Sequence, residues 1–131
     1  MNDLIIIRGL PGSGKTTYAR EKYKDYVNYE ADMYHTKNGV YVYKKENAGA
    51  AHNECLTRVA QSLKNHRKVV VSNTFTTQKE IDAYIKLATE LGKTYCIIRM
   101  TKQYGSIHGV PQSDIDKMKN RMVDIPGEVL V

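Results

Sequence analysis

Short, continuous apolar runs alternate along this chain with longer segments in which apolar residues recur every three or four positions. The continuous runs are residues 4–7, 69–71 and 95–98, and most of their members are β-branched. Such runs are typical of strands that are covered on both faces of a sheet. Residues 26–31 alternate apolar and polar positions more weakly, and we expect them to form a strand that pairs at a sheet edge.

The segments between these runs have the helical period. In residues 55–63 and 81–91 the apolar side chains fall on one stripe, and Gly92 follows the second segment where a C-cap glycine belongs. Residues 15–24 predict another helix, and a last one is expected from Pro111 through Met122. This alternation predicts an α/β three-layer sandwich with a mainly parallel four-stranded sheet, which binds ligands at the carboxyl ends of its strands.

Length and composition indicate one soluble domain. The chain has 131 residues, of which 41% are hydrophobic and 26% charged, so we expect a single domain over residues 1–131. No apolar run reaches the length needed to cross a bilayer, and Asp3 stands where a signal peptide would carry positive charge. We therefore expect a cytoplasmic protein. Cys55 and Cys96 lie far apart, at no spacing typical of a metal site or a disulfide framework.

The chain is basic, with 20 lysines and arginines against 14 acidic residues and a formal net charge of +6. An excess of positive charge favours phosphorylated partners, including nucleic acids. The alternative is that surface lysines only solvate a nucleotide-binding domain, and charge alone does not decide between the two.

The strongest chemical signal is a phosphate-binding pattern of glycine, four residues, glycine, lysine and threonine, between the first strand and the first helix. Backbone N–H groups and the helix N-terminus converge on an anion there. Lys15 is expected to reach the β- and γ-phosphates of ATP, and Thr16 to ligate Mg²⁺. The expected nucleotide-binding residues are Gly9, Pro11, Gly12, Ser13, Gly14, Lys15, Thr16 and Thr17.

Phosphoryl transfer also needs a positioned acceptor and a group that takes its proton. Asp32 follows the candidate edge strand, where an acceptor hydroxyl would face the γ-phosphate, so it is the candidate catalytic base. Two alternatives remain open for Asp32: capping a turn, or holding magnesium through water as a second metal residue beside Thr16.

Several segments resemble the kinase domain of phage polynucleotide 5′-hydroxyl kinase, within the broader group of small P-loop kinases and ATPases. They follow the same order over nearly the whole chain and comprise residues 9–20, 29–34, 41–47, 69–74 and 109–122. The resemblance implies transfer of the ATP γ-phosphate to a 5′-hydroxyl of RNA or DNA. It places Asp32 at the position of the general base, and Lys15 and Thr16 also match.

The sequence departs from that family in three places. His35 stands where the family has an arginine three residues after the acid, and residues 72–74 lack the family's aspartate at the end of the third strand. Residues 99–109 are too few for the usual arginine-bearing lid helix. Arg99, Lys102 and His108 are the positive groups left there, and we take Arg99 and Lys102 as candidate catalytic cations, with ordinary surface charges as the alternative.

Two other functions stay open. One is a kinase for a nucleoside, sugar or other small metabolite, similar to the zeta-toxin-like kinases. The other is a nucleotide-binding regulator without transferase activity, or with slow ATP hydrolysis, which the shortened lid and the missing acid favour. Asp32 and the net charge of +6 favour the kinase acting on nucleic-acid ends.

Overall fold

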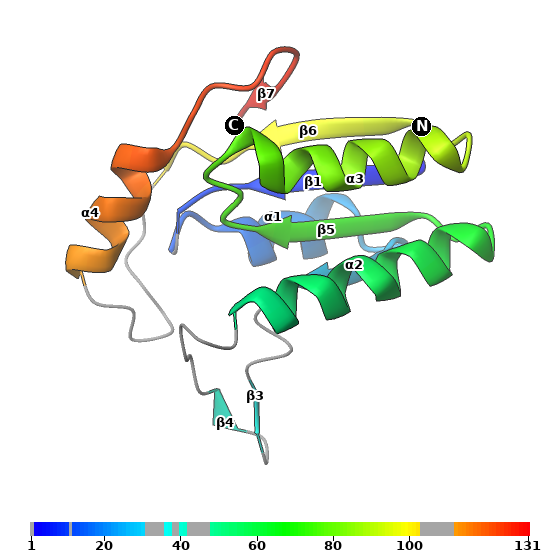
Figure 1. Cartoon of the computed structure of the whole chain (residues 1–131), viewed down its shortest axis with the longest axis horizontal. Helices are drawn as coiled ribbons and strands as arrows, with labels where there is room; N and C mark the ends of the chain where they lie inside the picture. Colours follow the sequence, from blue (N-terminus) through cyan, green and yellow to red (C-terminus); the bar gives the residue numbers. More distant parts are fainter. Residues whose placement is uncertain (1, 11, 31–35, 38–39, 42–47, 103–111) are drawn as a thin grey trace.

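The computed structural model describes residues 2–10, 12–30, 36–37, 40–41, 48–102 and 112–131 (Figure 1). Strands and helices alternate through most of the chain. In chain order the elements are β1 (Leu4–Arg8), α1 (Lys15–Lys22), β2 (Val27–Glu30), β3 (Thr36–Lys37), β4 (Val40–Tyr41), α2 (Ala48–Lys64), β5 (Val69–Asn73), α3 (Gln78–Glu90), β6 (Tyr95–Arg99), α4 (Gln112–Arg121) and β7 (Val129–Leu130).

The main sheet is parallel and has the strand order β2-β5-β1-β6-β7. The predicted three-layer α/β fold is therefore confirmed, and β2 lies at the sheet edge as expected. A fifth strand, β7, was not predicted, because its two residues are exposed and form no apolar run. A separate antiparallel pair, β3 and β4, lies between β2 and α2 in the chain.

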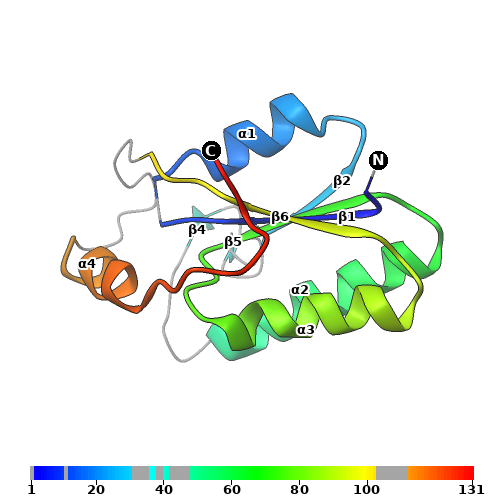
Figure 2. The same ribbon diagram turned by 90° about the horizontal axis from the view of Figure 1, so that it is seen from above.

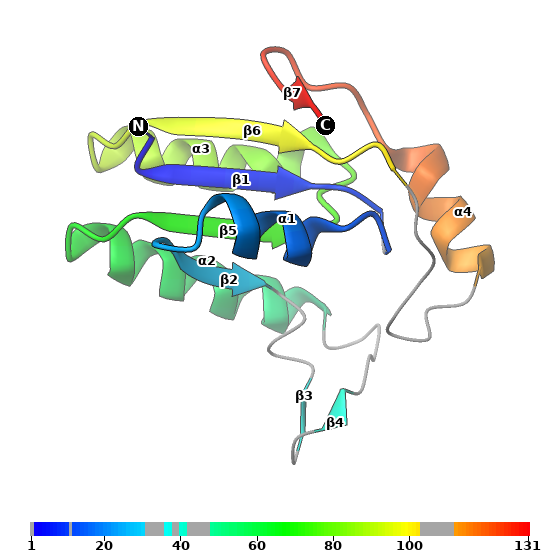
Figure 3. The ribbon, with the colours of Figure 1, turned by 180° about the vertical axis from the view of Figure 1, so that it is seen from behind.

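Helix α1 covers one face of the sheet, and α2 and α3 cover the other (Figure 2). The alternation of side chains along β1 divides the apolar residues between the two faces. Ile5 and Ile7 belong to the core cluster that contains Ala19 of α1, whereas Leu4 and Ile6 belong to the cluster packed under α2 and α3. Viewed from the α1 side, all long strands point toward the end of the molecule where α4 lies (Figure 3).

Local signals set the ends of α3. A capping box joins Thr77 and Glu80 at its start, so that two backbone N–H groups of the first turn are satisfied. After its last turn Gly92 has φ 67°, in the left-handed region that favours glycine, which confirms the predicted C-cap position. The capping box and Gly92 therefore set where α3 begins and ends.

A fully buried arginine ties the end of β1 to the segment after α4. The Arg8 guanidinium donates to the carbonyl oxygens of Phe75 (2.7 Å) and Val123 (2.6 Å), and to Glu128 Oε1 at 3.0 Å. Burial lowers the pKa of Arg8, and the hydrogen bond and charge of Glu128 oppose that shift. Phe75 has φ 48°, a left-handed conformation uncommon for a bulky residue, and two N–H groups of Arg8 bond its carbonyl.

Among the described residues, no helix combines the length and the apolar character required to span a bilayer. Cys55 of α2 is buried, and burial raises the pKa of its thiol, so the reactive thiolate is disfavoured there.

Candidate functional site

The phosphate loop, residues 9–16, joins β1 to α1 at the carboxyl edge of the sheet (Figure 3). Gly12 and Gly14 have φ values of 80° and 85°, which favour glycine. Gly9 has a different reason, because a Cβ there would lie 2.5 Å from Ser13 Oγ and 3.1 Å from Met100 Cβ. The three glycines therefore allow a turn tight enough to bring backbone N–H groups around an anion.

The start of α1 carries the positive end of the helix. Gly14 is its N-cap and supplies no side-chain cap, and the first turn contains no acidic residue. Lys15 Nζ lies over the loop and donates to the carbonyl oxygens of Gly9 and Leu10, each at 2.9 Å. A lysine held in this way keeps its ammonium group within the loop, where it can meet a phosphate.

The other predicted nucleotide-binding residues differ in their surroundings. Ser13 is buried, and its Oγ has no hydrogen-bond partner among the described residues. Thr17 is exposed on α1. Pro11 lies outside the described residues. The buried Ser13 hydroxyl is a polar group that a bound phosphate oxygen or a water molecule would satisfy.

A carboxylate that the sequence analysis did not single out contacts the predicted metal residue. Thr16 Oγ1 donates a hydrogen bond of 2.7 Å to Glu30 Oε1, at the last position of β2. Glu30 is the register partner of Ser72 on β5, which in turn pairs with Ile7 on β1, so these side chains share the face that α1 covers. Ser72 is buried, and its Oγ has no partner among the described residues.

These groups fit a hard cation. Thr16, Glu30 and Ser72 offer hydroxyl and carboxylate oxygens, the ligand type that Mg²⁺ prefers. The part of the chain that is described contains no cluster of three or more histidine, cysteine and acidic side chains able to hold a metal. Thr16 could serve as a protein ligand of such a cation beside a nucleotide phosphate.

The remaining predicted catalytic residues are placed only in part. Asp32 lies outside the described residues, as do His35 and His108, which were named only as departures from the family. Lys102 is exposed beyond the end of β6. Arg99, the last residue of β6, forms ion pairs with Asp124 at 2.5 Å and with Glu128 at 3.6 Å, so its guanidinium faces the segment after α4.

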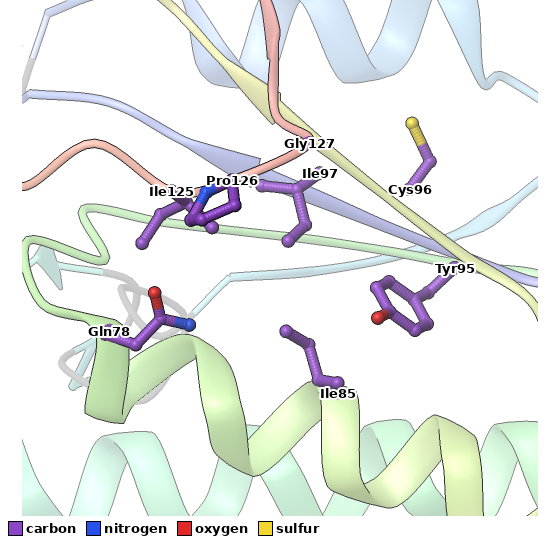
Figure 4. A pocket seen from close by; sticks show the side chains of 8 residues that line it. All are labelled: Gln78, Ile85, Tyr95, Cys96, Ile97, Ile125, Pro126 and Gly127. Atoms are coloured by element: carbon purple, nitrogen blue, oxygen red, sulfur yellow. The ribbon is translucent and has the colours of Figure 1, made fainter.

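A hollow away from the phosphate loop lies between α3, β6 and the segment after α4 (Figure 4). Its volume is about 350 Å³, and Gln78 and Ile85 from α3 face Tyr95, Ile97 and the turn before β7 across it. None of its lining residues belongs to the predicted site. This hollow is therefore separate from the phosphate loop, and we assign it no part in nucleotide binding.

Comparison with known proteins points to one family. Residues 4–103, which include β1, the phosphate loop and β6, match the family AAA_33, described as an AAA domain. An uncharacterized protein of Pasteurella multocida (strain Pm70), PM0531, is 27% identical over 142 residues, covering 96% of this chain and 79% of that protein.

Solved structures share the fold at low identity. A gluconokinase from Sinorhizobium meliloti 1021 has a TM-score of 0.67 and 16% identity, covering 97% of this chain and 80% of that one. A sugar kinase from Janibacter sp. HTCC2649 has a TM-score of 0.72 and 14% identity, covering 100% and 85%. The Pnkp1/Rnl/Hen1 RNA repair complex has a TM-score of 0.71 and 19% identity, covering 91% and 43%.

Proposed function

This chain belongs to the AAA domain family AAA_33, and we propose that it is a P-loop kinase that transfers the γ-phosphate of ATP to the 5′-hydroxyl of a nucleic acid. The observation that carries the proposal is the phosphate loop. Lys15 lies over its backbone, and Thr16 begins α1 beside an acidic side chain.

The nucleotide end of the proposed site is built from the loop. Family membership implies ATP binding, and the N–H groups around Gly12 and Gly14 are the expected phosphate donors. Lys15 would exchange its two carbonyl contacts for the β- and γ-phosphates. A bound Mg²⁺ would supply positive charge against the charge that develops during transfer. Thr16 would hold it as the proposed protein ligand, and Asp32 would hold it through a water molecule.

The acceptor end of the proposed site rests on Asp32. As general base, Asp32 would accept the proton of the attacking hydroxyl as the new P–O bond forms and the bond to ADP breaks. Support comes from the resemblance to polynucleotide 5′-hydroxyl kinase and from Glu30, two positions earlier in the chain, which contacts Thr16. The net charge of +6 favours a polyanionic acceptor.

We further propose Arg99 and Lys102 as the cations that stabilise the transferring phosphoryl group. Arg99 would first leave Asp124, whose side chain is 95% exposed, and Glu128, which keeps Arg8 as its nearer cation. An ion pair as exposed as the one with Asp124 is worth less than about 1 kcal/mol, so its loss costs little. Lys102 is already exposed to solvent.

A small hydroxylated metabolite is the second candidate acceptor. The fold matches a gluconokinase and a sugar kinase with TM-scores of 0.67 and 0.72, as closely as it matches the RNA repair complex at 0.71. Fold likeness at these identities does not choose an acceptor. The proposed unit for either activity is one kinase-like domain over residues 1–131.

The test is transfer from γ-labelled ATP with magnesium to four acceptors: 5′-hydroxyl RNA, 5′-hydroxyl DNA, a nucleoside and gluconate. We expect labelled oligonucleotide from the wild type, at least 100-fold less from Asp32→Asn, and none above background from Lys15→Ala. Label on gluconate or the nucleoside alone would show that the acceptor is a small metabolite and not a nucleic acid. ATP binding without transfer to any acceptor would favour the nucleotide-binding regulator.

A further inference from the structure

In the hydrogen bond between Thr16 and Glu30, the hydroxyl must be the donor and the carboxylate the acceptor. A hydroxyl group has one proton and two acceptor lone pairs, and a carboxylate can only accept. Thr16 Oγ1 therefore donates to Glu30 Oε1 across 2.7 Å, and its lone pairs stay available. An oxygen ligand whose proton is accepted by a carboxylate is more basic and better oriented toward a cation.

Strand β5 offers no acid for this purpose. It ends in Ser72 and Asn73, where a P-loop protein commonly has an aspartate that helps to hold magnesium. Glu30 is the register partner of Ser72 on the neighbouring strand, so its carboxylate lies next to the end of β5. The buried Ser72 hydroxyl, which has no partner among the described residues, is beside it on the same face. The two residues together offer a negative charge and a donor.

We propose that Glu30 is the positioning residue for magnesium binding: it orients the Thr16 hydroxyl and supplies, from β2, the negative charge that β5 lacks. Ser72 completes the network as a donor to Glu30 or to a water on the metal. The inference rests on the proposed use of Mg²⁺ and ATP by the phosphate loop, and it assigns a role to Glu30, which the phosphate-binding pattern does not include.

The proposal predicts that removing the Glu30 carboxylate weakens ADP binding in the presence of magnesium but not in its absence. Without the metal, a carboxylate close to the loop repels the nucleotide phosphates, so its removal should leave ADP affinity unchanged or raise it. With the metal, loss of a partner that orients a ligand typically costs 10- to 100-fold in metal affinity. A purely structural role for Glu30 would instead weaken nucleotide binding equally in both conditions.

The experiment measures ADP affinity by calorimetry with Mg²⁺ and with EDTA, for the wild type and three variants. Glu30→Gln keeps an oxygen that accepts the Thr16 proton but removes the charge, and Glu30→Ala removes both. Glu21→Gln removes the same charge from an exposed position on α1 and serves as the matched control. We expect the ratio of the two affinities to fall about 10- to 100-fold for Glu30→Ala, less for Glu30→Gln, and not for Glu21→Gln.

A second readout is the relaxation of water protons by Mn²⁺ in the ADP complex, which reports the metal site without turnover. Glu30→Ala should weaken Mn²⁺ binding by a similar factor, and Ser72→Ala by less. Equal losses with and without magnesium, or an unchanged ratio in Glu30→Ala, would overturn the inference. Failure of the wild type to bind ADP in either condition would overturn the proposed function instead, so the two failures are distinguishable.

Discussion

Two glutamates approach the carboxyl edge of the main sheet from opposite faces, and their partners differ. Glu128, 7% exposed, meets the guanidinium of Arg8 at 3.0 Å on the face covered by α2 and α3. Glu30, on the α1 face, meets a neutral hydroxyl, that of Thr16, as its hydrogen-bond partner among the described residues. The first carboxylate is compensated by the protein itself, and the second has a partner without charge.

This difference suggests that the Arg8–Glu128 pair serves the stability of the fold, whereas the Thr16–Glu30 pair serves the proposed metal site. A buried charge is tolerated only when it is paired, so each member of the Arg8–Glu128 pair depends on the other for the folded state. A carboxylate that is only partly buried, like that of Glu30, does not need a cation of the protein for folding. A metal cation that binds together with the nucleotide can neutralise its charge. Substitutions at the two glutamates should therefore move different observables.

The largest expected effect is on the compensated side. Arg8→Met removes the nearer of the two cations beside Glu128, with Arg99 remaining at 3.6 Å, and leaves the Phe75 carbonyl without two donors, so we expect a loss of about 3–5 kcal/mol in the free energy of unfolding. Urea denaturation measures it. In the double variant with Glu128→Gln no carboxylate is left unpaired, so its loss should be smaller than the sum of the two single losses. Additive losses would show that the two charges do not depend on each other.

The same measurement on the other glutamate should give a small value. Glu30→Gln keeps an acceptor for the Thr16 proton and leaves no buried charge unpaired, so the free energy of unfolding should change by less than about 1 kcal/mol. A loss as large as that of Arg8→Met would make Glu30 a structural residue and remove the contrast between the two sides.

Smaller still is the expected effect at the exposed ion pair beside Glu128. Asp124 pairs with Arg99 at 2.5 Å, but its side chain is 95% exposed. Solvent screening limits such a pair, so Asp124→Asn should lower the free energy of unfolding by about 0.5 kcal/mol or less. A faster phosphate transfer in this variant would indicate that release of Arg99 from Asp124 limits turnover. An unchanged rate would argue against Arg99 as a cation that stabilises the phosphoryl group during transfer.

The smallest effect is expected from Asp3, at the opposite edge of the sheet. A hydrogen bond from the Thr94 backbone N–H, helped by the Thr94 hydroxyl, lowers the pKa of Asp3. A lowered folded-state pKa stabilises the fold above the unfolded pKa of about 3.9, and this contribution is lost as pH falls through the folded value. Wild type and Asp3→Asn should therefore differ in melting temperature at pH 6 and converge toward pH 3. A gap that widens toward acid would reverse the sign.

The features that could be predicted from the sequence are those determined by short, continuous segments. The β-branched runs gave β1, β5 and β6, Gly92 gave the end of α3, and the spacing of glycine, lysine and threonine gave the phosphate loop. Each depends on a few consecutive residues, so a period or a motif is enough to predict it.

The missed features depend on contacts between distant parts of the chain. Glu30 meets Thr16 only because the edge strand β2 ends beside the start of α1, and alternation along a short strand does not reveal that contact. Strand β7 consists of two exposed residues and forms only by pairing with β6. Nothing in the residues around Arg8 indicates its partner Glu128, which is 120 positions away. The role of Asp32 stays a prediction, since it lies outside the described residues.

That separation has a consequence during synthesis. At about 5–20 residues per second, roughly 6–24 s pass between the translation of Arg8 and that of Glu128. Throughout this interval β1, the central strand of the sheet, carries a guanidinium whose carboxylate does not yet exist, so docking of its neighbours against that charge is disfavoured. The nascent chain is thereby biased to finish its core late, and a ribosome that stalls before Glu128 would leave a central strand exposed to chaperones and proteases.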